Sequence, residues 1–327
     1  MEKVTEQTAP KQRLRYLDWL KLLAAFLVVF YHLAFYDLDY GFTAGQFYLP
    51  NVNRVLMSFA ACSVPLFFLI NGALLFRRHR SWKEMLLKAA KLLVLILVWR
   101  PVEFPDWFFR TLIILYLMFP VLQWFKERYP VLLKLGCSAV FIMPFGYNLS
   151  LMVLKGLALP GLIPDWTREL TVVGCFTMYS ILYFCLGPRL EQMQPWTLNR
   201  ALLFTVAGWS LTVLECVIYT NSYQKMWDGV NSAFPTVGAL LMAAGLFMAF
   251  RYVSLPRADR FLNWCCEGIL AIYLLHQICL VVLKNLFALE SYGIPVALAV
   301  TAAACFLSIL PQKFCKKIPF LEWFFRI

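Results

Sequence analysis

Three ionisable side chains share one stripe of the first apolar segment, LDWLKLLAAFLVVFYH: Asp18, Lys21 and His32. At 3.6 residues per turn, Lys21 and His32 differ by about 20° around a helix axis, and Asp18 and His32 by about 40°. His32 would lie roughly 16 Å farther along the axis than Lys21. An imidazole inside a membrane can serve as a general base near neutral pH. This stripe therefore predicts a catalytic site formed by His32, Lys21 and Asp18.

Each of these residues also has a structural interpretation. Asp18 and Lys21 stand at positions i and i+3, which is the spacing of an interfacial ion pair. His32 could cap a helix end or contact lipid headgroups. Ionisable residues inside a membrane span are costly, and they are usually functional or paired. The spacing alone leaves both interpretations open.

Transmembrane helices are the elements that must position these residues. The chain has 327 residues, of which 61% are hydrophobic and 15% charged, whereas soluble domains have about 45–50% apolar and about 25% charged residues. A spanning helix needs about 20 mostly apolar residues. We expect an all-α, polytopic transmembrane bundle of about ten helices in the cell membrane, over residues 17–36, 55–76, 85–99, 107–125, 130–147, 171–187, 201–220, 232–250, 265–287 and 293–310.

Charge asymmetry predicts the orientation of this bundle. With both termini in the cytoplasm, the inside segments hold 21 Lys and Arg and the outside segments hold four. The net charge of +12 then reflects loop charge facing anionic lipid and requires no nucleic-acid partner. We expect a cytoplasmic tail over 1–16, one membrane domain over 17–310 and a basic cytoplasmic tail over 311–327.

Two further features concern the loops and the metal-binding residue types. The apolar stretch 149–164 is interrupted by four Gly and Pro residues, so we expect it to be re-entrant or interfacial. The ten cysteines and three histidines show no metal-ligand spacing. No metal is therefore predicted.

The stretch RYLDWLKLLAAFLVVFYHLAF resembles the first helix of the acyltransferase 3 family, the membrane O-acyltransferases that modify bacterial surface glycans. That family typically has a basic residue, ten intervening residues and His, which Lys21 and His32 match, although Arg is usual at the basic position. Four further stretches follow in the family's order: SVPLFFLINGALLF with Asn71, LLKAAKLL with Lys88 and Lys91, DWFFRTLIILYLMFP with Trp107 and Arg110, and GILAIYLLHQICL with Tyr273 and His276.

The resemblance implies acetyl-CoA as acyl donor and a hydroxyl of a cell-envelope carbohydrate or related compound as acceptor. Lys88 and Lys91 share a helical face at the membrane edge, where they could hold CoA phosphates. The positive-inside rule also explains such a cluster, and we expect Arg77 and Arg80 to be ordinary loop charges. Further candidates for the pocket are Asn71, Trp107, Arg110, Tyr273 and His276, although His276 is equally typical of a satisfied core histidine and Arg110 of an ion pair with Asp106.

Two functions follow from these observations. The preferred one is a membrane acyltransferase, an O-acetyltransferase whose partners are acyl-CoA, an envelope glycan or other hydroxyl acceptor, and membrane lipid. The alternative is a proton-coupled transporter of a polar solute or lipid-linked sugar, which buried Asp, Lys, His and Glu residues would suit. The absence of a clear inverted repeat argues against the transporter.

Overall fold

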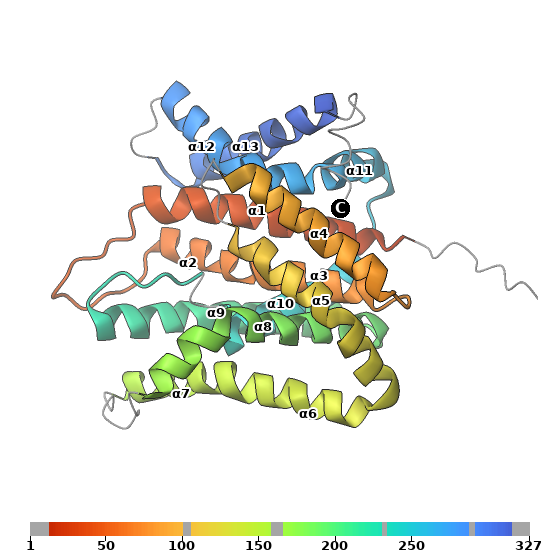
Figure 1. Ribbon diagram of the computed structural model, residues 1–327. Coiled ribbons are helices and arrows are strands. Elements are labelled where there is room, and N and C mark those ends of the chain that lie inside the picture. Colours follow the sequence, from red (N-terminus) through yellow and green to blue (C-terminus); the bar gives the residue numbers. More distant parts are fainter. Residues whose placement is uncertain (1–12, 101–105, 158–165, 231–233, 288–291, 316–327) are drawn as a thin grey trace, which may run out of the picture.

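Long helices, packed side by side, make up the described part of the protein (Figure 1). The structure is a computed structural model, and it describes residues 13–100, 106–157, 166–230, 234–287 and 292–315, where no strand occurs. In chain order the helices are α1 (Arg15–Asp37), α2 (Val52–Ser58), the 3₁₀ turn η1 (Phe59–Cys62), α3 (Ser63–Leu75), α4 (Trp82–Trp99), α5 (Trp107–Arg128), α6 (Pro130–Val140), the π-helical η3 (Phe141–Gly146), α7 (Tyr147–Gly156), α8 (Trp166–Gln192), α9 (Leu198–Tyr223), α10 (Val237–Ala249), the turns η6 (Phe250–Tyr252) and η7 (Pro256–Ala258), α11 (Asp259–Glu267), α12 (Ile269–Leu286) and α13 (Ile294–Cys315).

These helices confirm the predicted all-α transmembrane bundle. Each of the ten predicted apolar ranges overlaps one helix or consecutive helices, although 232–233 lie outside the described residues and 234–236 precede α10. Among the described residues, seven helices are long and apolar enough to cross a bilayer. An eighth span is added if the helix pair Val237–Tyr252 and Pro256–Glu267, which bends by 100°, is one broken span. The first helix begins at Arg15 and the last described helix ends at Cys315, slightly beyond the predicted limits of 17 and 310 for the membrane domain.

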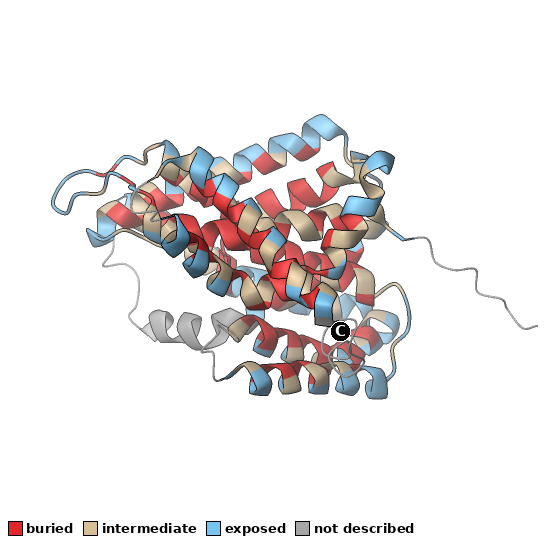
Figure 2. Cartoon of the chain, turned by 90° about the horizontal axis from the view of Figure 1, so that it is seen from above, coloured by how far each residue is buried: buried red, intermediate tan, exposed pale blue. Residues whose placement is uncertain are grey.

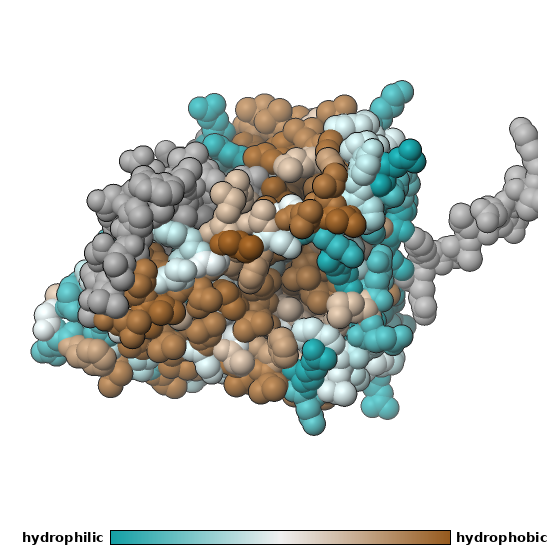
Figure 3. Space-filling model, turned by 90° about the horizontal axis from the view of Figure 1, so that it is seen from below, coloured by the Kyte–Doolittle hydropathy of each residue, from teal (hydrophilic) through white to brown (hydrophobic). Residues whose placement is uncertain are grey.

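The two ends of the bundle differ in charge. Helix α1 begins at one end of the bundle, and α3, α5, α8, α10 and α13 finish at that same end. We call it the basic end. In Figure 3 hydrophilic residues gather there, at the right of the view, while hydrophobic residues cover the neighbouring surface. At the opposite end, Asp37 accepts hydrogen bonds from Lys284 Nζ at 2.6 Å and from Tyr292 Oη at 2.5 Å. These bonds tie the last turn of α1 to α12 and to the start of α13.

Glycines allow two pairs of helices to approach closely. A Cβ on Gly72 of α3 would collide with the Phe184 carbonyl of α8, and a Cβ on Gly187 of α8 would collide with the Leu69 carbonyl of α3. On α10, a Cβ on Gly245 would come within 2.5 Å of Thr205 Oγ1 of α9. Small residues bring backbones together in this way in membrane bundles, where van der Waals packing replaces the hydrophobic effect. The buried residues accordingly follow the middle of the bundle (Figure 2).

The spans differ from the expected ones in two places. Of the stretch 149–164, expected to be re-entrant or interfacial, residues 149–156 instead continue the helix that begins at Pro130, so that Pro130–Gly156 forms one candidate span of 27 residues; 158–165 lie outside the described residues. Pro144 is accommodated by the π-helical turn η3, and Asn148 Nδ2 donates to the Pro144 carbonyl at 2.8 Å. The expected span 265–287 is present as α12, itself a candidate span, but it begins only after Gly268, because residues 265–267 belong to α11.

Candidate active site

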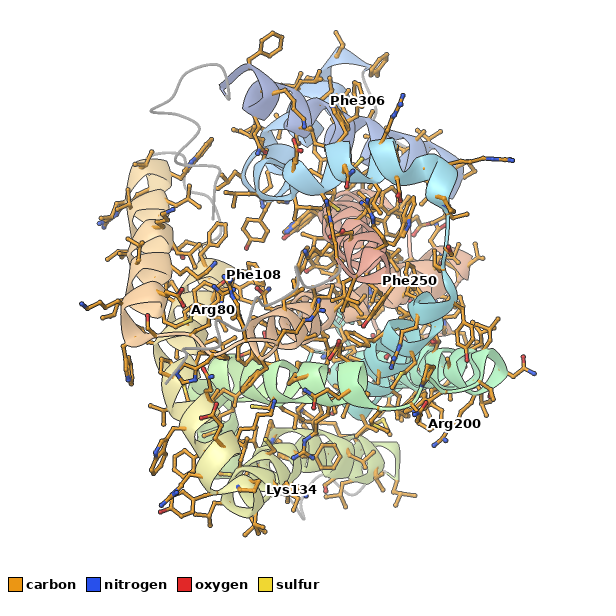
Figure 4. All side chains as sticks on the ribbon, turned by 90° about the vertical axis from the view of Figure 1, so that its right-hand side faces the viewer. Arg80, Phe108, Lys134, Arg200, Phe250 and Phe306 are labelled. Atoms are coloured by element: carbon orange, nitrogen blue, oxygen red, sulfur yellow. The ribbon has the colours of Figure 1, made fainter. Side chains whose placement is uncertain are left out.

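A cavity of about 510 Å³ lies between α1, α3, α4, α5 and the α11–α12 junction. Figure 4 looks onto the basic end, and it shows Arg80, at that end, and Phe108, at the start of α5, both on the inner side of α4. Among the described residues, three cations and one acid line this cavity. The acid, Glu267, forms an ion pair with Lys313, whose Nζ lies 2.7 Å from Glu267 Oε2. The polar lining comprises Lys21, Asn71, Arg80, Lys88, Tyr116, Cys266, Glu267 and Tyr273.

Asp18 anchors the inner turn of α1 beside this cavity. Its buried carboxylate accepts from Arg13 Nε at 2.6 Å and from Lys21 Nζ at 3.5 Å. The hydrogen bond and the charge of Asp18 raise the pKa of Arg13 above its usual value, although burial acts in the opposite direction. The predicted i,i+3 pair is therefore present, but Arg13 is a second partner that the spacing argument missed. Lys21 lines the cavity, whereas Asp18 does not line it and is linked to it only by its contact with Lys21.

One wall of the cavity joins three helices through polar contacts. Asn71 Nδ2 donates to the Phe67 carbonyl at 2.9 Å, and Tyr116 Oη donates to Asn71 Oδ1 at 3.4 Å. Lys88 Nζ lies 5.8 Å from the centre of the Tyr116 ring. The half-buried Lys88 thus lines the cavity as expected, while Lys91, one turn farther along α4, is not among its described lining residues.

Arg80 corrects an expectation about the loop after α3. It was expected to be an ordinary loop charge, yet its side chain is only 15% exposed and lines the cavity. Its Nη1 lies 4.0 Å from Glu84 Oε2, and among the described residues its buried Nε has no hydrogen-bond partner. Arg80 immediately precedes the capping box of Ser81 and Glu84 that begins α4, and its backbone N–H donates to Gln123 Oε1 of α5 at 3.3 Å.

His32 and His276 lie in contact across α1 and α12, with ring centres 5.0 Å apart. The Nδ1 of His276 faces two carbonyl oxygens, of Ile272 at 2.9 Å and of Tyr273 at 2.8 Å. Because both neighbours can only accept, Nδ1 must carry the proton, which leaves the lone pair on Nε2. That Nε2 is buried and has no partner among the described residues. The arrangement presents one unoccupied basic nitrogen beside His32.

A small void beside His276 shares part of its wall with the cavity. Its walls include Val28, Phe67 and His276, and its volume of about 10 Å³ is at the lower limit for one water molecule. Phe67, Ile269 and Tyr273 line both the void and the larger cavity. Tyr273, expected from the sequence, therefore lies between the basic cavity and the void at His276, whereas His32 lines neither of them. Phe67 and Tyr116 were not expected, because apolar and aromatic residues on such helices are ordinarily core residues.

Two of the expected pocket residues lie elsewhere. Arg110 Nη2 pairs with Asp106 Oδ2 at 2.7 Å, and its side chain is 69% exposed, so the ion pair expected as its alternative role is present. Trp107 packs against Phe234 with ring centres 6.0 Å apart. Neither lines the described cavities. The described residues also contain no group of three or more His, Cys, Asp or Glu arranged to hold a metal ion.

The helices and this cavity define a multispanning helical membrane protein with a polar site inside its bundle. The acyltransferase domain family matches residues 14–102 and 104–312, nearly the whole chain. The chain therefore belongs to the acyltransferase 3 family, and it is a membrane acyltransferase. Comparison with curated proteins and with solved structures gave no match.

Proposed function

We propose that the protein transfers acetyl from acetyl-CoA to a hydroxyl group of a cell-envelope carbohydrate or a related acceptor. The observation that carries this proposal is the cavity at the basic end, which is lined by Lys21, Arg80 and Lys88 and borders, through Tyr273, the void at His276. His32 contacts His276 from α1. CoA is a polyanion with a long, narrow arm that ends in the thioester. Its phosphates suit the three cations, and the arm points the thioester into the bundle.

The spacing along α1 agrees with this orientation of CoA. Lys21 and His32 are separated by about three turns, roughly 16 Å along the axis, which the extended pantetheine arm can span. The acetyl group would then lie near His32 while the phosphates remain at the basic end. Tyr273 and Phe67 would have to move aside, since the void between them is small.

The chemistry assigns one role to each histidine. His32 removes the proton of the acceptor hydroxyl as its oxygen attacks the thioester carbonyl carbon, and the C–S bond then breaks. The CoA thiolate takes the proton back from His32, so that ester and free thiol are the products. The lone pair on His276 Nε2 accepts a hydrogen bond from the imidazolium of His32 and stabilises it, as an orienting partner does in other acid–base pairs. A transient acetyl group on His32 is the alternative route.

The purified protein in detergent tests this proposal with acetyl-CoA labelled in the acetyl group. We expect CoA thiol to be released and label to move to a hydroxyl acceptor supplied as envelope polysaccharide, with slow transfer to water in its absence. The same preparation, sealed into vesicles, should not accumulate labelled sugars. Accumulation of solute without release of CoA would support the transporter and reject the proposed reaction.

A further inference from the structure

A second cavity at the basic end, of about 240 Å³, lies between the ends of α5 and α8 and the start of α6. Cations from three helices line it: Lys126 of α5, Lys134 of α6 and Arg189 of α8. The remaining walls are mainly apolar and include Phe76 and Leu133. Figure 4 shows Lys134 at the lower edge of this end, on the opposite side of α3 from α12 and α13.

The three cations are not neutralised by the described part of the protein. None of them forms an ion pair there, and no acid lines the cavity. Glu127, adjacent to Lys126 in the chain, instead contacts His79 Nδ1 at 3.5 Å and accepts from Gln123. Lys126 Nζ lies 5.0 Å from the centre of the Phe76 ring. Three like charges around one concave site repel each other, and an anion bound among them would remove that repulsion.

The surface beside this cavity faces the membrane. Helix α6 has no buried residue, and Val131, Leu132 and Leu135 are more than half exposed. At the adjoining end of α5, Trp124 and Tyr129 contact each other with ring centres 5.2 Å apart, and both are exposed. Exposed Trp and Tyr mark the headgroup level of a bilayer. The cavity therefore lies at the membrane depth of lipid headgroup phosphates, and the apolar helix α6 extends from it toward the bilayer core.

We infer that this cavity binds the headgroup phosphate of an anionic glycerophospholipid, whose acyl chains lie along α6. Basic pockets between helices at one membrane face bind anionic headgroups through the same chemistry. The site is separate from the acyl-CoA cavity, and it does not depend on the proposed reaction. It would fix the position of α6 against α5 and α8.

Native mass spectrometry of the detergent-purified protein tests this inference, with phosphatidylglycerol and phosphatidylcholine of identical chains as probes. We expect one phosphatidylglycerol to bind at least tenfold more tightly than phosphatidylcholine. The triple variant Lys126→Gln, Lys134→Gln and Arg189→Gln should lose this preference, because each charge near a membrane surface is worth roughly fivefold in affinity. The control variant Arg128→Gln, Arg257→Gln and Arg260→Gln removes three exposed charges from the same end and should retain it.

Three results would overturn the inference. Equal affinity for the two lipids in the unchanged protein, or equal loss in both triple variants, would mean that only the diffuse charge of this end attracts lipid. Displacement of bound phosphatidylglycerol by micromolar CoA would identify a site for a soluble phosphate. If the triple variant does not fold, the single variants Lys134→Gln and Lys134→Arg provide the test, since Lys134 is exposed: the first should weaken phosphatidylglycerol binding and the second should restore it. Identical binding by both would also contradict the inference.

Discussion

His276 is held in place by backbone hydrogen bonds, and His32 packs beside it. His276 is held by two backbone carbonyls through Nδ1, so its Nε2 is a fixed acceptor in a buried place. His32 is half-buried and packs against His276 and Tyr31, whose hydroxyl donates to Asp228 at 2.9 Å. The sequence predicted that Lys21 and His32 share a helix face. It could not predict the contact with His276, because residues on α1 and α12 meet only through tertiary packing.

Lys21 offers a test of the ion pair at the start of α1. Removing the Lys21 charge does not leave Asp18 unpaired, because Arg13 Nε lies 2.6 Å from that carboxylate. We therefore expect Lys21→Met to fold with little loss of thermal stability and to raise the Michaelis constant for acetyl-CoA, since the cation that faces the cavity is lost. Lys21→Arg should keep substantial activity because it keeps the charge. Full activity of Lys21→Met in the detergent assay would show that the residue serves only Asp18.

At the scale of helices, hydropathy predicted the spans well and their interruptions poorly. Apolar length determines where a helix crosses a bilayer, because backbone groups in lipid must bond within the helix. For the same reason the lipid-exposed helix that begins at Pro130 continues to Gly156, although the stretch 149–164 was expected to interrupt it. At Gly268, where α11 ends, a Cβ would lie 2.6 Å from Ile309 Cγ1, so the glycine at this break allows α13 to approach closely. That approach is a tertiary feature and leaves no mark on local hydropathy.

The contact between α3 and α8 should depend on Gly187. Gly187→Ala places a methyl group against the Leu69 carbonyl, which is backbone and cannot rotate away. We expect a loss of roughly 1–3 kcal/mol in stability, as for other overpacked sites, measured as a lower midpoint of thermal unfolding in detergent. Gly136→Ala on α6 is the matched control, because nothing lies within 4 Å of its added Cβ. Equal midpoints for the two variants would contradict the close packing of these helices.

The face of α4 that lines the cavity carries one of the two predicted lysines. Lys88→Gln should raise the Michaelis constant for acetyl-CoA severalfold and leave that for the acceptor nearly unchanged, with a smaller effect at high salt. Lys91→Gln should do less, because Lys91 is not among the described lining residues. Lys83→Gln removes an exposed charge from the same helix and serves as the control. A similar rise for both substrates would mean that Lys88 supports the helix rather than the donor.

At the scale of the whole molecule, the exposed Ala44 follows α1, which begins at the basic end, whereas the exposed Ser254 follows α10, which finishes at the basic end. The two residues therefore lie at opposite ends of the bundle. The excess of Lys and Arg predicts that the basic end is cytoplasmic. In a cysteine-free background, we expect Ala44→Cys to react with a membrane-impermeant thiol reagent in intact cells. Ser254→Cys should react only after the membrane is permeabilised. The reverse pattern would place the cavity for acyl-CoA outside the cell, where no CoA is available, and would reject the proposed donor.

The central claim is that His32, with His276 beside it, performs the acyl transfer from acyl-CoA bound in the basic cavity. It is tested most directly by the rate at which purified protein releases CoA from acetyl-CoA with envelope polysaccharide as acceptor. We expect His32→Ala to reduce this rate by about 10² to 10⁴, the usual loss for a general base. His276→Phe, which keeps a ring but removes both nitrogens, should lower the rate without changing the affinity for acetyl-CoA. Both variants should elute as folded protein in gel filtration. A near-normal rate for folded His32→Ala would contradict the account.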